Sequence, residues 1–485
     1  MRVHLVGVAG TGMGALAALF AQAGHEVSGS DVAFDPPIGP ALRELGIRCL
    51  QGYDAAHLAP PPDLVVIGNA IRRENPEAVA AERLGLPRTS MSAALREHFL
   101  AKRRPLIVAG THGKTTTSAM AAWLLAKGGF DPGWFIGGIP KGLGGGAAAG
   151  SSRIRPDRGR GPFVVEGDEY DAVYWHKQPK FLDYVGVSAD DVVILTSVEH
   201  DHIDIYPDPL SYEAAFRQLA SRIPPKGLLV VDAHDSRARA VAADAKATVV
   251  FYALERDDTG EVTPTWLAAP AHVMPDGSQA FDLFVGGASC GRYALRVPGR
   301  HNIRNALGAL AATVTGFGAS VHDARAHLAS FEGVRRRQDL LGEPDGVRVY
   351  DDFAHHPTAV DETLRALRTR HPDGQLWVAF EPRSATACRA LHQQAYARSF
   401  DAADQVLLAP LGRTNVPAPE RLDLERLARE LGAKATAAAD VDAILERLVH
   451  GARPGDTVAL LSNGAFGGVH ARLLDALEAR GRTPA

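Results

Sequence analysis

The chain has 485 residues, of which 46% are hydrophobic and 22% charged, an ordinary composition for a folded globular protein. At roughly 100–200 residues per domain, this length predicts about three domains. The net charge of -4 gives no basic excess for nucleic-acid binding. The three cysteines (Cys49, Cys290 and Cys388) have neither disulfide nor thiolate-zinc spacing.

The sequence shows no signal peptide and no stretch near the ~20 apolar residues of a membrane helix. We therefore expect a cytoplasmic protein that binds neither membrane nor nucleic acid.

Three successive stretches alternate strands with helices, which predicts parallel sheets and the α/β fold class. The first has strands at Val3–Val8, Glu26–Gly29 and Leu64–Ile67, with a helix at about Ala15–Ala23. The second begins with a strand at Leu106–Ala109 and a helix through Leu125. It continues with a loop over 128–161, strands at Phe163–Val165 and Val192–Thr196, and a helix at Asn302–Thr315. The third has strands at Val347–Tyr350, Leu376–Phe380, Gln405–Ala409 and Thr457–Leu461.

The segment Gly110–Thr116 is the strongest single signal for function. It reads Gly-Thr-His-Gly-Lys-Thr-Thr and lies between a predicted strand and a predicted helix, where backbone N–H groups and the helix N-terminus bind phosphates. Lys114 is expected to reach the β- and γ-phosphates of ATP, and the Thr115 hydroxyl to bind Mg²⁺. Val108 replaces the first glycine of the usual P-loop, so a tight turn with a surface lysine remains the alternative. The residues assigned to ATP here are Gly110, Thr111, His112, Gly113, Lys114, Thr115 and Thr116.

Two acidic segments follow later strands and are candidates for binding the metal ion. Glu166, Asp168, Glu169 and Asp171 come directly after Phe163–Val165, and carboxylates at that position can hold Mg²⁺. Glu166 is the leading candidate, and a solvated acidic turn is the alternative. The second segment, 199–204, contains two histidines without helical zinc spacing. It favours one histidine near a phosphate-bound Mg²⁺ over a zinc site.

A second glycine turn at residues 7–14 also joins a strand to a helix. Gly10, Gly12 and Ala15 match the dinucleotide fingerprint, and Asp31 follows about 20 residues later. This pattern alone predicts NAD and a nicotinamide-dependent dehydrogenase. However, the pyrophosphate of a UDP-linked substrate would bind the same turn equally well.

Taken together, these motifs resemble the Mur ligase family of peptidoglycan enzymes from Met1 to about Arg472. The resemblance implies a Rossmann-like UDP-sugar-binding domain at 1–100, a central P-loop ATPase-like α/β domain at 101–318 and a Rossmann-like C-terminal domain at 319–485. The last would bind the amino substrate. It also implies an ATP-dependent carboxylate–amine ligase that forms a C–N bond through an acyl phosphate.

The resemblance assigns further site residues. Lys114, Glu166 and His202 are the implied catalytic residues, and Thr115, Glu166 and His202 the implied metal ligands. Asn302 is expected to meet the adenine, Arg337 the ATP phosphates and Asp352 the ribose. The residues expected at the UDP-sugar are Gly10, Thr11, Gly12, Met13, Ser30, Asp31, Asn69 and Ala70. His355 and His356 could line the peptide site or cap a helix. Arg383 could bind a peptide carboxylate or be structural.

The resemblance also narrows the substrates to UDP-N-acetylmuramate and one of two amines. The segment Tyr206–Pro225 contains no lysine, which excludes members that use a carbamylated lysine. The remaining members add either L-alanine or the tripeptide L-alanyl-γ-D-glutamyl-meso-diaminopimelate. Several segments resemble the tripeptide-adding, peptidoglycan-recycling members: Gly68–Ala70, Asn75–Glu77, Tyr350–Ala359, Glu381–Thr386 and Ser462–Gly468. The glycine- and arginine-rich segment Lys141–Pro162 departs from the family pattern.

Overall fold

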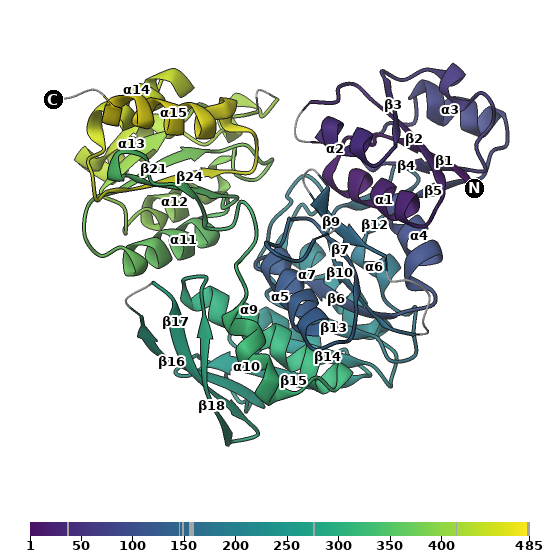
Figure 1. Cartoon of the computed structure of the whole chain (residues 1–485), viewed down its shortest axis with the longest axis horizontal. Coiled ribbons are helices and arrows are strands. Elements are labelled where there is room, and N and C mark those ends of the chain that lie inside the picture. Colours follow the sequence, from purple (N-terminus) through teal and green to yellow (C-terminus); the bar gives the residue numbers. More distant parts are fainter. Residues whose placement is uncertain are drawn as a thin grey trace.

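The computed structural model describes residues 1–35, 38–144, 146–147, 150–154, 160–274, 277–413 and 415–482. They form three α/β bodies, and Figure 1 shows the N-terminal body at the upper right and the C-terminal body at the upper left, both above the central one. The predicted α/β class with two Rossmann-like bodies around a central P-loop-like body is confirmed.

The N-terminal body is a parallel sheet with the strand order β3–β2–β1–β4–β5. Its strands are β1 (Arg2–Val6), β2 (Glu26–Asp31), β3 (Arg48–Gln51), β4 (Leu64–Ile67) and β5 (Arg88–Ser90). Its helices are α1 (Thr11–Gln22), α2 (Ile38–Glu44), α3 (Pro76–Arg83) and α4 (Met91–Leu95). Because β1 pairs with β4, the loops after these two strands meet at one edge of the sheet.

The central body is built on a larger mixed sheet with the order β18–β17–β16–β15–β14–β13–β6–β10–β7–β9–β8. Its parallel part is β6 (Arg104–Ala109), β7 (Gly133–Ile136), β10 (Pro162–Glu166), β13 (Val192–Leu195), β14 (Leu228–Asp232) and β15 (Thr248–Leu254), joined by β16 (Trp266–Val273). Its helices are α5 (Lys114–Lys127), α6 (Phe181–Tyr184), α7 (Pro209–Arg222), α8 (Ser236–Ala242), α9 (Arg300–Ala311) and α10 (Val321–Ala329).

Alternate residues of β6 pack into different cores, because successive side chains of a strand point to opposite faces. Leu106 and Val108 pack with α5 and α9, whereas Ile107 and Ala109 pack with α6 and α7. A strand buried on both faces is apolar throughout. Its end at Ala109 therefore delivers the phosphate loop to the carboxyl edge of the sheet.

The prediction of a loop over 128–161 is wrong for the residues of this stretch that the structure describes. This stretch contains β7 and two short antiparallel strands, β8 (Gly146–Ala147) and β9 (Gly150–Arg153). The Ser152 hydroxyl donates to the Ala15 carbonyl of α1 at 2.9 Å, and the Gln22 amide donates to the Ser152 carbonyl at 3.2 Å. The departing segment Lys141–Pro162 thus fastens the N-terminal body to the central sheet. Its residues 145, 148–149 and 155–159 lie outside the described part.

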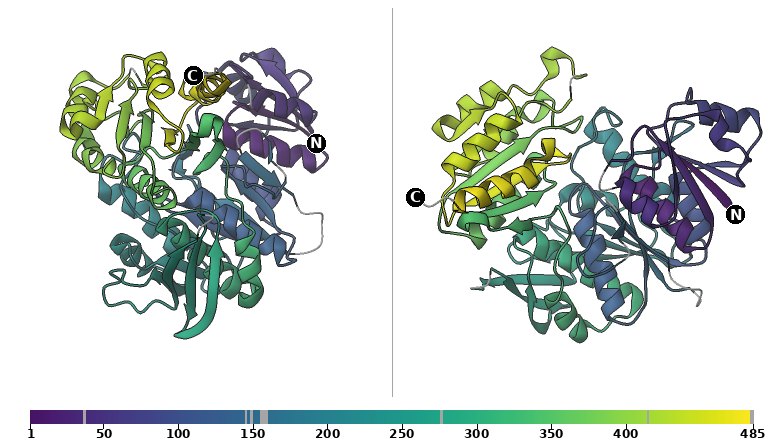
Figure 2. Two further views of the ribbon diagram at one scale, coloured as in Figure 1. Left: turned by 60° about the vertical axis from the view of Figure 1, so that its left-hand side comes forward. Right: turned by 45° about the horizontal axis from the view of Figure 1, so that its top comes forward.

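Two antiparallel strands extend the other end of the central sheet, β17 (Gln279–Val285) and β18 (Ala288–Leu295). Helix α10 packs against β18 and α5. Its residues Ala324 and Leu328 share a core with Val334 and the central helices. The apolar core of the central body therefore continues beyond Gly318. Figure 2 shows this part of the chain below the other two bodies.

The C-terminal body has the strand order β19–β20–β24–β21–β22–β23, with β19 antiparallel to β20. Its strands are β19 (Asp339–Gly342), β20 (Arg348–Asp352), β21 (Leu376–Glu381), β22 (Gln405–Leu408), β23 (Ala435–Ala437) and β24 (Thr457–Ser462). Its helices are α11 (Pro357–Arg370), α12 (Gln393–Ser399), α13 (Leu424–Leu431), α14 (Val441–Gly451) and α15 (Val469–Arg482).

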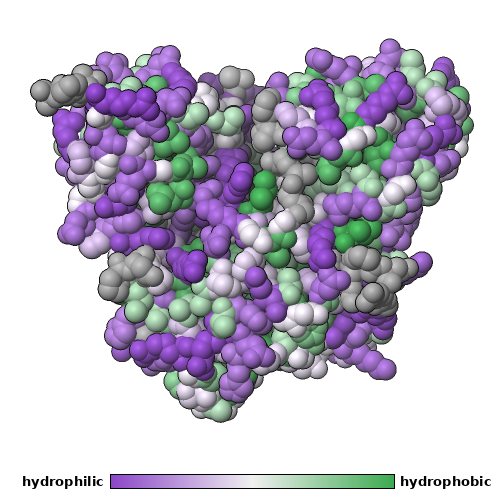
Figure 3. Space-filling view, viewed as in Figure 1, coloured by the Kyte–Doolittle hydropathy of each residue, from purple (hydrophilic) through white to green (hydrophobic). Residues whose placement is uncertain are grey.

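Within the described residues, no helix is long and apolar enough to cross a membrane. Hydrophilic side chains cover most of the face in Figure 3.

Candidate active site

A cavity of about 660 Å³ lies between the glycine turn at residues 7–14 and the central sheet. Seven of the residues predicted for the UDP-sugar line it: Gly10, Thr11, Gly12, Met13, Asp31, Asn69 and Ala70. Residues of the central body, including Gly137, Glu166 and Lys180, complete its wall. The cavity therefore connects the N-terminus of α1 with the end of β10.

Ser30 was predicted at the same site, but it does not line this cavity. The Ser30 side chain is fully buried and donates to the Glu77 carboxylate at 2.5 Å. It alternates in direction with its neighbour on β2, Asp31, which faces the cavity. The Asp31 carboxylate accepts from the Ala9 N–H at 2.8 Å and thereby fixes the glycine turn.

The phosphate loop requires glycine at two positions. Gly110 has φ +130°, and a side-chain Cβ there would lie 2.2 Å from the Thr196 hydroxyl oxygen. Gly113 has φ +75°, and its Cβ would lie 2.3 Å from the Asn305 amide oxygen. Both backbone conformations are open mainly to glycine. The two glycines therefore let the loop pack closely against Thr196 and Asn305.

Glu166 is the carboxylate that connects the phosphate loop to the cavity. Its Oε1 accepts from the Thr115 hydroxyl at 2.7 Å, and its Oε2 accepts from the Gly137 N–H at 2.7 Å. Glu166 also lines the 660 Å³ cavity. The two residues predicted to share Mg²⁺ are therefore in contact, and they adjoin the place where a sugar nucleotide would end.

Glu169 is a site residue that the sequence does not single out from the neighbouring acids. Its buried carboxylate accepts from Lys114 Nζ at 2.7 Å and from the Tyr212 hydroxyl at 3.3 Å. Lys114 also donates to the Gly110 and Thr111 carbonyls of its own loop. His202, with φ +53°, places Nε2 3.9 Å from the other Glu169 oxygen. Glu169 thus brings Lys114 and His202 together.

A second cavity, of about 480 Å³, opens beside the phosphate loop. His112, Gly113, His301 and Asn305 line it, together with residues that follow β13 and β14 and with Tyr252 of β15. Asn302 does not line it, because its buried amide group donates to the Pro298 carbonyl and accepts from Asn305. Helix α9 therefore turns Asn305 rather than Asn302 toward this space.

The C-terminal body reaches the phosphate loop through Arg337. The Arg337 guanidinium donates to the Thr115 hydroxyl at 3.3 Å and lies 4.8 Å from the centre of the Phe353 ring. Asp352, which was predicted to lie near the ribose, does not line the 480 Å³ cavity. Its buried carboxylate accepts from the Gln338 and Ala354 N–H groups, and burial raises its pKa. Asp352 therefore fixes the backbone that carries Arg337.

A histidine–carboxylate cluster joins the central and C-terminal bodies. His112 Nε2 lies 2.6 Å from Glu199 Oε2, and the Thr358 hydroxyl donates to both Glu199 oxygens at 2.9 and 3.0 Å. Burial alone would lower the pKa of His112, but Glu199 outweighs it and the pKa is raised. Burial alone would raise the pKa of Glu199, but the hydrogen bond and charge of His112 help to lower it to about 2.

The three residues predicted for the peptide differ in how deeply they are buried: His355, His356 and Arg383. His356 is buried, caps α11 by accepting from the Thr358 N–H, and has its pKa lowered to about 3 by burial. Its ring lies 4.9 Å from that of His112. Burial also lowers the pKa of His355. Arg383 is half-exposed, with its Nη1 3.9 Å from the Glu381 carboxylate.

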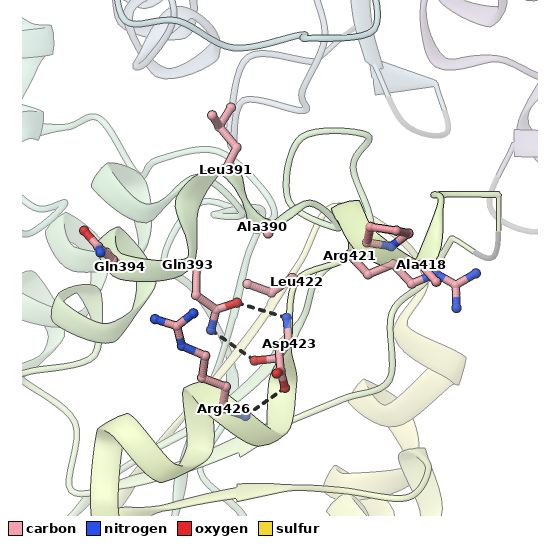
Figure 4. Close-up of a pocket in the computed structure, with 10 residues that line it drawn as sticks. Ala390, Leu391, Gln393, Gln394, Ala418, Arg421, Leu422, Asp423 and Arg426 are labelled. Atoms are coloured by element: carbon pink, nitrogen blue, oxygen red, sulfur yellow. Dashed lines mark hydrogen bonds between the residues drawn. The ribbon is translucent and has the colours of Figure 1, made fainter.

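A third cavity, of about 620 Å³, lies in the C-terminal body between α12 and α13 (Figure 4). The Gln393 side chain holds its wall by bonding to the backbone N–H and carbonyl of Asp423. The Asp423 carboxylate accepts from the Arg426 N–H at 2.8 Å. Its described lining includes none of the residues that the sequence predicts for the site.

Three α/β domains, in which Glu166 links the cavity at the glycine turn to the phosphate loop, form the arrangement of a nucleotide-dependent enzyme. Family models cover most of the chain. The Mur ligase family catalytic-domain model matches residues 2–103, the middle-domain model 176–313 and the glutamate-ligase-domain model 336–464. The chain belongs to the Mur ligase family. Members of this family are ATP-dependent ligases that form C–N bonds, so the dehydrogenase alternative is set aside.

Relatives of two kinds match nearly the whole chain. The UDP-N-acetylmuramate–L-alanyl-gamma-D-glutamyl-meso-2,6-diaminoheptandioate ligase of Escherichia coli is 37% identical over 98% of both chains. The UDP-N-acetylmuramate–L-alanine ligase of Chloroflexus aggregans is 36% identical over 98% of both chains. The crystal structure of a murein peptide ligase from Psychrobacter arcticus is 32% identical, with a TM-score of 0.72 over all of both chains.

Proposed function

We propose that this enzyme uses ATP to join L-alanyl-γ-D-glutamyl-meso-diaminopimelate to UDP-N-acetylmuramate in the recycling of peptidoglycan in the cytoplasm. One observation carries the proposal. The cavity that begins at the glycine turn ends at Glu166, and Glu166 contacts Thr115 of the phosphate loop. A sugar nucleotide bound at the turn can therefore extend its acid group toward ATP.

The choice of the tripeptide over L-alanine rests on two supports. Relatives named for the tripeptide match at 34–37% identity over 98% of the chain. The segments Gly68–Ala70 and Glu381–Thr386 resemble the same members. The L-alanine ligases match almost as closely, so L-alanine is the second candidate.

The donor set at Thr115 and Glu166 fits Mg²⁺. A hydroxyl and a carboxylate oxygen, already 2.7 Å apart, are hard oxygen ligands of the kind this cation takes. His202 is the third proposed ligand, on the far side of Glu169. When bound, the cation would supply charge neutralisation at the triphosphate.

The site residues suggest how the reaction is assisted. The lactyl carboxylate of UDP-N-acetylmuramate attacks the γ-phosphorus of ATP, which gives an acyl phosphate and ADP. Lys114 neutralises charge that develops on the phosphoryl oxygens, and Arg337 approaches the same loop from the C-terminal body. The tripeptide's free α-amine then attacks the acyl carbon, a tetrahedral intermediate collapses, and phosphate leaves. Alignment of the reactants supplies most of the remaining acceleration.

We propose the domain limits 1–100, 101–318 and 319–485 for UDP-sugar, ATP and amino-substrate binding, respectively. The packing of α10 on the central core favours moving the second limit to about Val334. For ATP we retain the phosphate loop and Arg337, and we add His301 and Asn305 from the cavity lining. His355, His356 and Arg383 remain proposals for the peptide.

Phosphate release tests the proposal directly. Purified protein would be incubated with ATP, Mg²⁺ and UDP-N-acetylmuramate, and with either the tripeptide or L-alanine in parallel. Release with the tripeptide is the expected result. Release with L-alanine alone would instead assign the enzyme to the first step of stem-peptide synthesis. Release with neither amine would refute the ligase assignment for these substrates.

A further inference from the structure

The 660 Å³ cavity has an unbalanced charge for its proposed ligand. Four acidic residues line it, Asp31, Asp35, Glu166 and Asp168, and among the described lining residues Lys180 is the one base. UDP-N-acetylmuramate carries a diphosphate and a carboxylate, so each anionic group needs a partner of its own. Lys180 is the fixed cation that the cavity itself offers.

Lys180 is built into the wall rather than extended into solvent. It follows β12 (His176–Pro179), is 4% exposed, and its backbone N–H donates to the Tyr170 carbonyl at 3.1 Å. Its Nζ donates to Asp168 Oδ2 at 2.8 Å and lies 5.7 Å from the centre of the Tyr170 ring. An ammonium group has three donors. Among the described residues, Asp168 accepts the one Nζ hydrogen bond of Lys180, which leaves two donors for a ligand.

Asp168 explains how a lysine is held in this position. Burial alone would raise the pKa of Asp168, but the charge and hydrogen bond of Lys180 and the Tyr170 N–H hold it below its usual value. The Asp168 carboxylate accepts from that N–H at 2.7 Å. Because both partners are anchored, the ammonium group has little freedom to turn away from the cavity.

Lys180 and the glycine turn lie on different walls of the cavity, so they can bind different anionic groups of one ligand. The N-terminus of α1, with Gly10, Thr11 and Gly12, suits the diphosphate. Lys180 belongs to the wall formed by the central body, together with Glu166, whose carboxylate contacts Thr115. An anion at Lys180 therefore lies on the side from which the γ-phosphoryl group is transferred.

We propose that Lys180 binds the lactyl carboxylate of the acceptor and positions it for phosphorylation. This assignment rests on the proposed function, because it presumes a UDP-sugar that carries that carboxylate. Lys180 would also distinguish muramate from sugar nucleotides that lack the lactyl group. Two hydrogen bonds from a charged donor to a carboxylate give both attraction and orientation.

A comparison of two ligands isolates this contact. UDP-N-acetylmuramate and UDP-N-acetylglucosamine differ by the lactyl ether, and their affinities can be measured by calorimetry without ATP. We expect Lys180→Met to weaken UDP-N-acetylmuramate binding by roughly 10- to 100-fold. It should change UDP-N-acetylglucosamine binding less than about twofold, and Lys180→Arg should retain part of the preference. Lys177→Met is the matched control, since Lys177 is an exposed neighbour paired with Asp171.

Other outcomes would overturn the assignment. Equal losses for both nucleotides would place the diphosphate at Lys180, and no loss for either would remove Lys180 from the site. If Lys180→Met does not fold, Lys180→Met/Asp168→Asn removes both charges and should show the same selective loss. Wild-type protein that binds neither nucleotide would refute the proposed function itself, whereas wild-type preference for the muramate that survives in Lys180→Met would refute only the role of Lys180.

Discussion

At the scale of single residues, Lys114 carries the sharpest functional prediction. Its ammonium group is held by two loop carbonyls and by Glu169, within the loop that would receive the triphosphate. We expect Lys114→Ala to lower kcat about 10²- to 10³-fold, because one preorganised charge at the transferred phosphoryl group is lost. Phosphate release measures this. Lys127→Ala, at the exposed end of the same helix, is the control.

The same substitution should also affect stability, because Glu169 loses its cation. The Glu169 side chain is 2% exposed, and removing one partner of a buried ion pair costs about 3–5 kcal/mol. Lys114→Ala/Glu169→Gln should recover much of that loss in urea unfolding while staying inactive. Near-normal phosphate release by Lys114→Ala would contradict the ATP assignment, whatever the stability result.

The contact between His112 and Glu199 predicts a pH dependence. The pKa of His112 is raised, so its contribution to stability is complete below its usual 6.5 and disappears as pH rises through the raised value. The pKa of Glu199 is lowered to about 2, so its contribution is present above its usual 4.5 and disappears as pH falls toward 2. Both contributions act together from about pH 4.5 to 6.5.

Glu199→Gln should therefore reduce the free energy of unfolding more at pH 6 than at pH 9. The loss at pH 6 should be on the order of 1 kcal/mol, since the Glu199 side chain is 40% exposed and solvent screens the pair. Urea unfolding at the two pH values measures it. Glu213→Gln, which breaks a pair with Arg217 instead, should show no such difference. A loss that is equal at both pH values would exclude His112 as the titrating partner.

At the scale of elements, the turn into α5 depends on backbone that only glycine adopts easily. Gly113 and Gly129 flank this helix with φ +75° and +80°, but a Cβ would meet Asn305 only at Gly113. Both alanine variants should lose about 1 kcal/mol for the left-handed backbone. Gly113→Ala should lose more and should also bind ATP more weakly. Thermal unfolding and ATP titration test this. Equal effects of the two variants would show that the close approach to Asn305 is unimportant.

The sequence predicts the elements that carry this turn because their signals are local. An apolar strand, glycine, lysine and a helix occur in one short segment, and β6 and α5 form there. The neighbouring acids were harder to rank. Glu166 continues the strand, so its direction follows from the pleat. Glu169 lies beyond the strand, where no periodicity fixes direction, and its burial depends on Tyr212 more than 40 residues away.

The strands that the sequence did not predict form because they pair with strands far away in the chain or with each other. The stretch 128–161 is rich in glycine and alanine and therefore predicts a loop, yet β7 and β9 form there because the central sheet pairs with them. The family resemblance likewise assigns Ser30 to the UDP-sugar, but its hydroxyl donates to the buried Glu77 of α3. The local composition of a segment does not indicate such long-range partners.

At the scale of the whole molecule, the C-terminal body contributes to the wall of the proposed nucleotide site. Thr358 and Glu362 of α11 line the 480 Å³ cavity, and Thr358 bonds to both oxygens of Glu199 in the central body. Arg337 makes a second contact, with Thr115. These contacts across domains are the ones that would hold the enzyme closed while an acyl phosphate is present.

Thr358→Val should therefore uncouple the two half-reactions. It removes the single hydroxyl donor that the two Glu199 oxygens share, a hydrogen bond to a charged group worth about 1.5–3 kcal/mol, so we expect amide formation to slow about tenfold. Phosphate release should fall less, because water reaches the acyl phosphate in the opened site. Phosphate and amide product would be measured in the same reaction, with Thr369→Val on the exposed face of α11 as the control. A ratio of phosphate to amide that stays at one in Thr358→Val would show that this contact does not hold the domains closed.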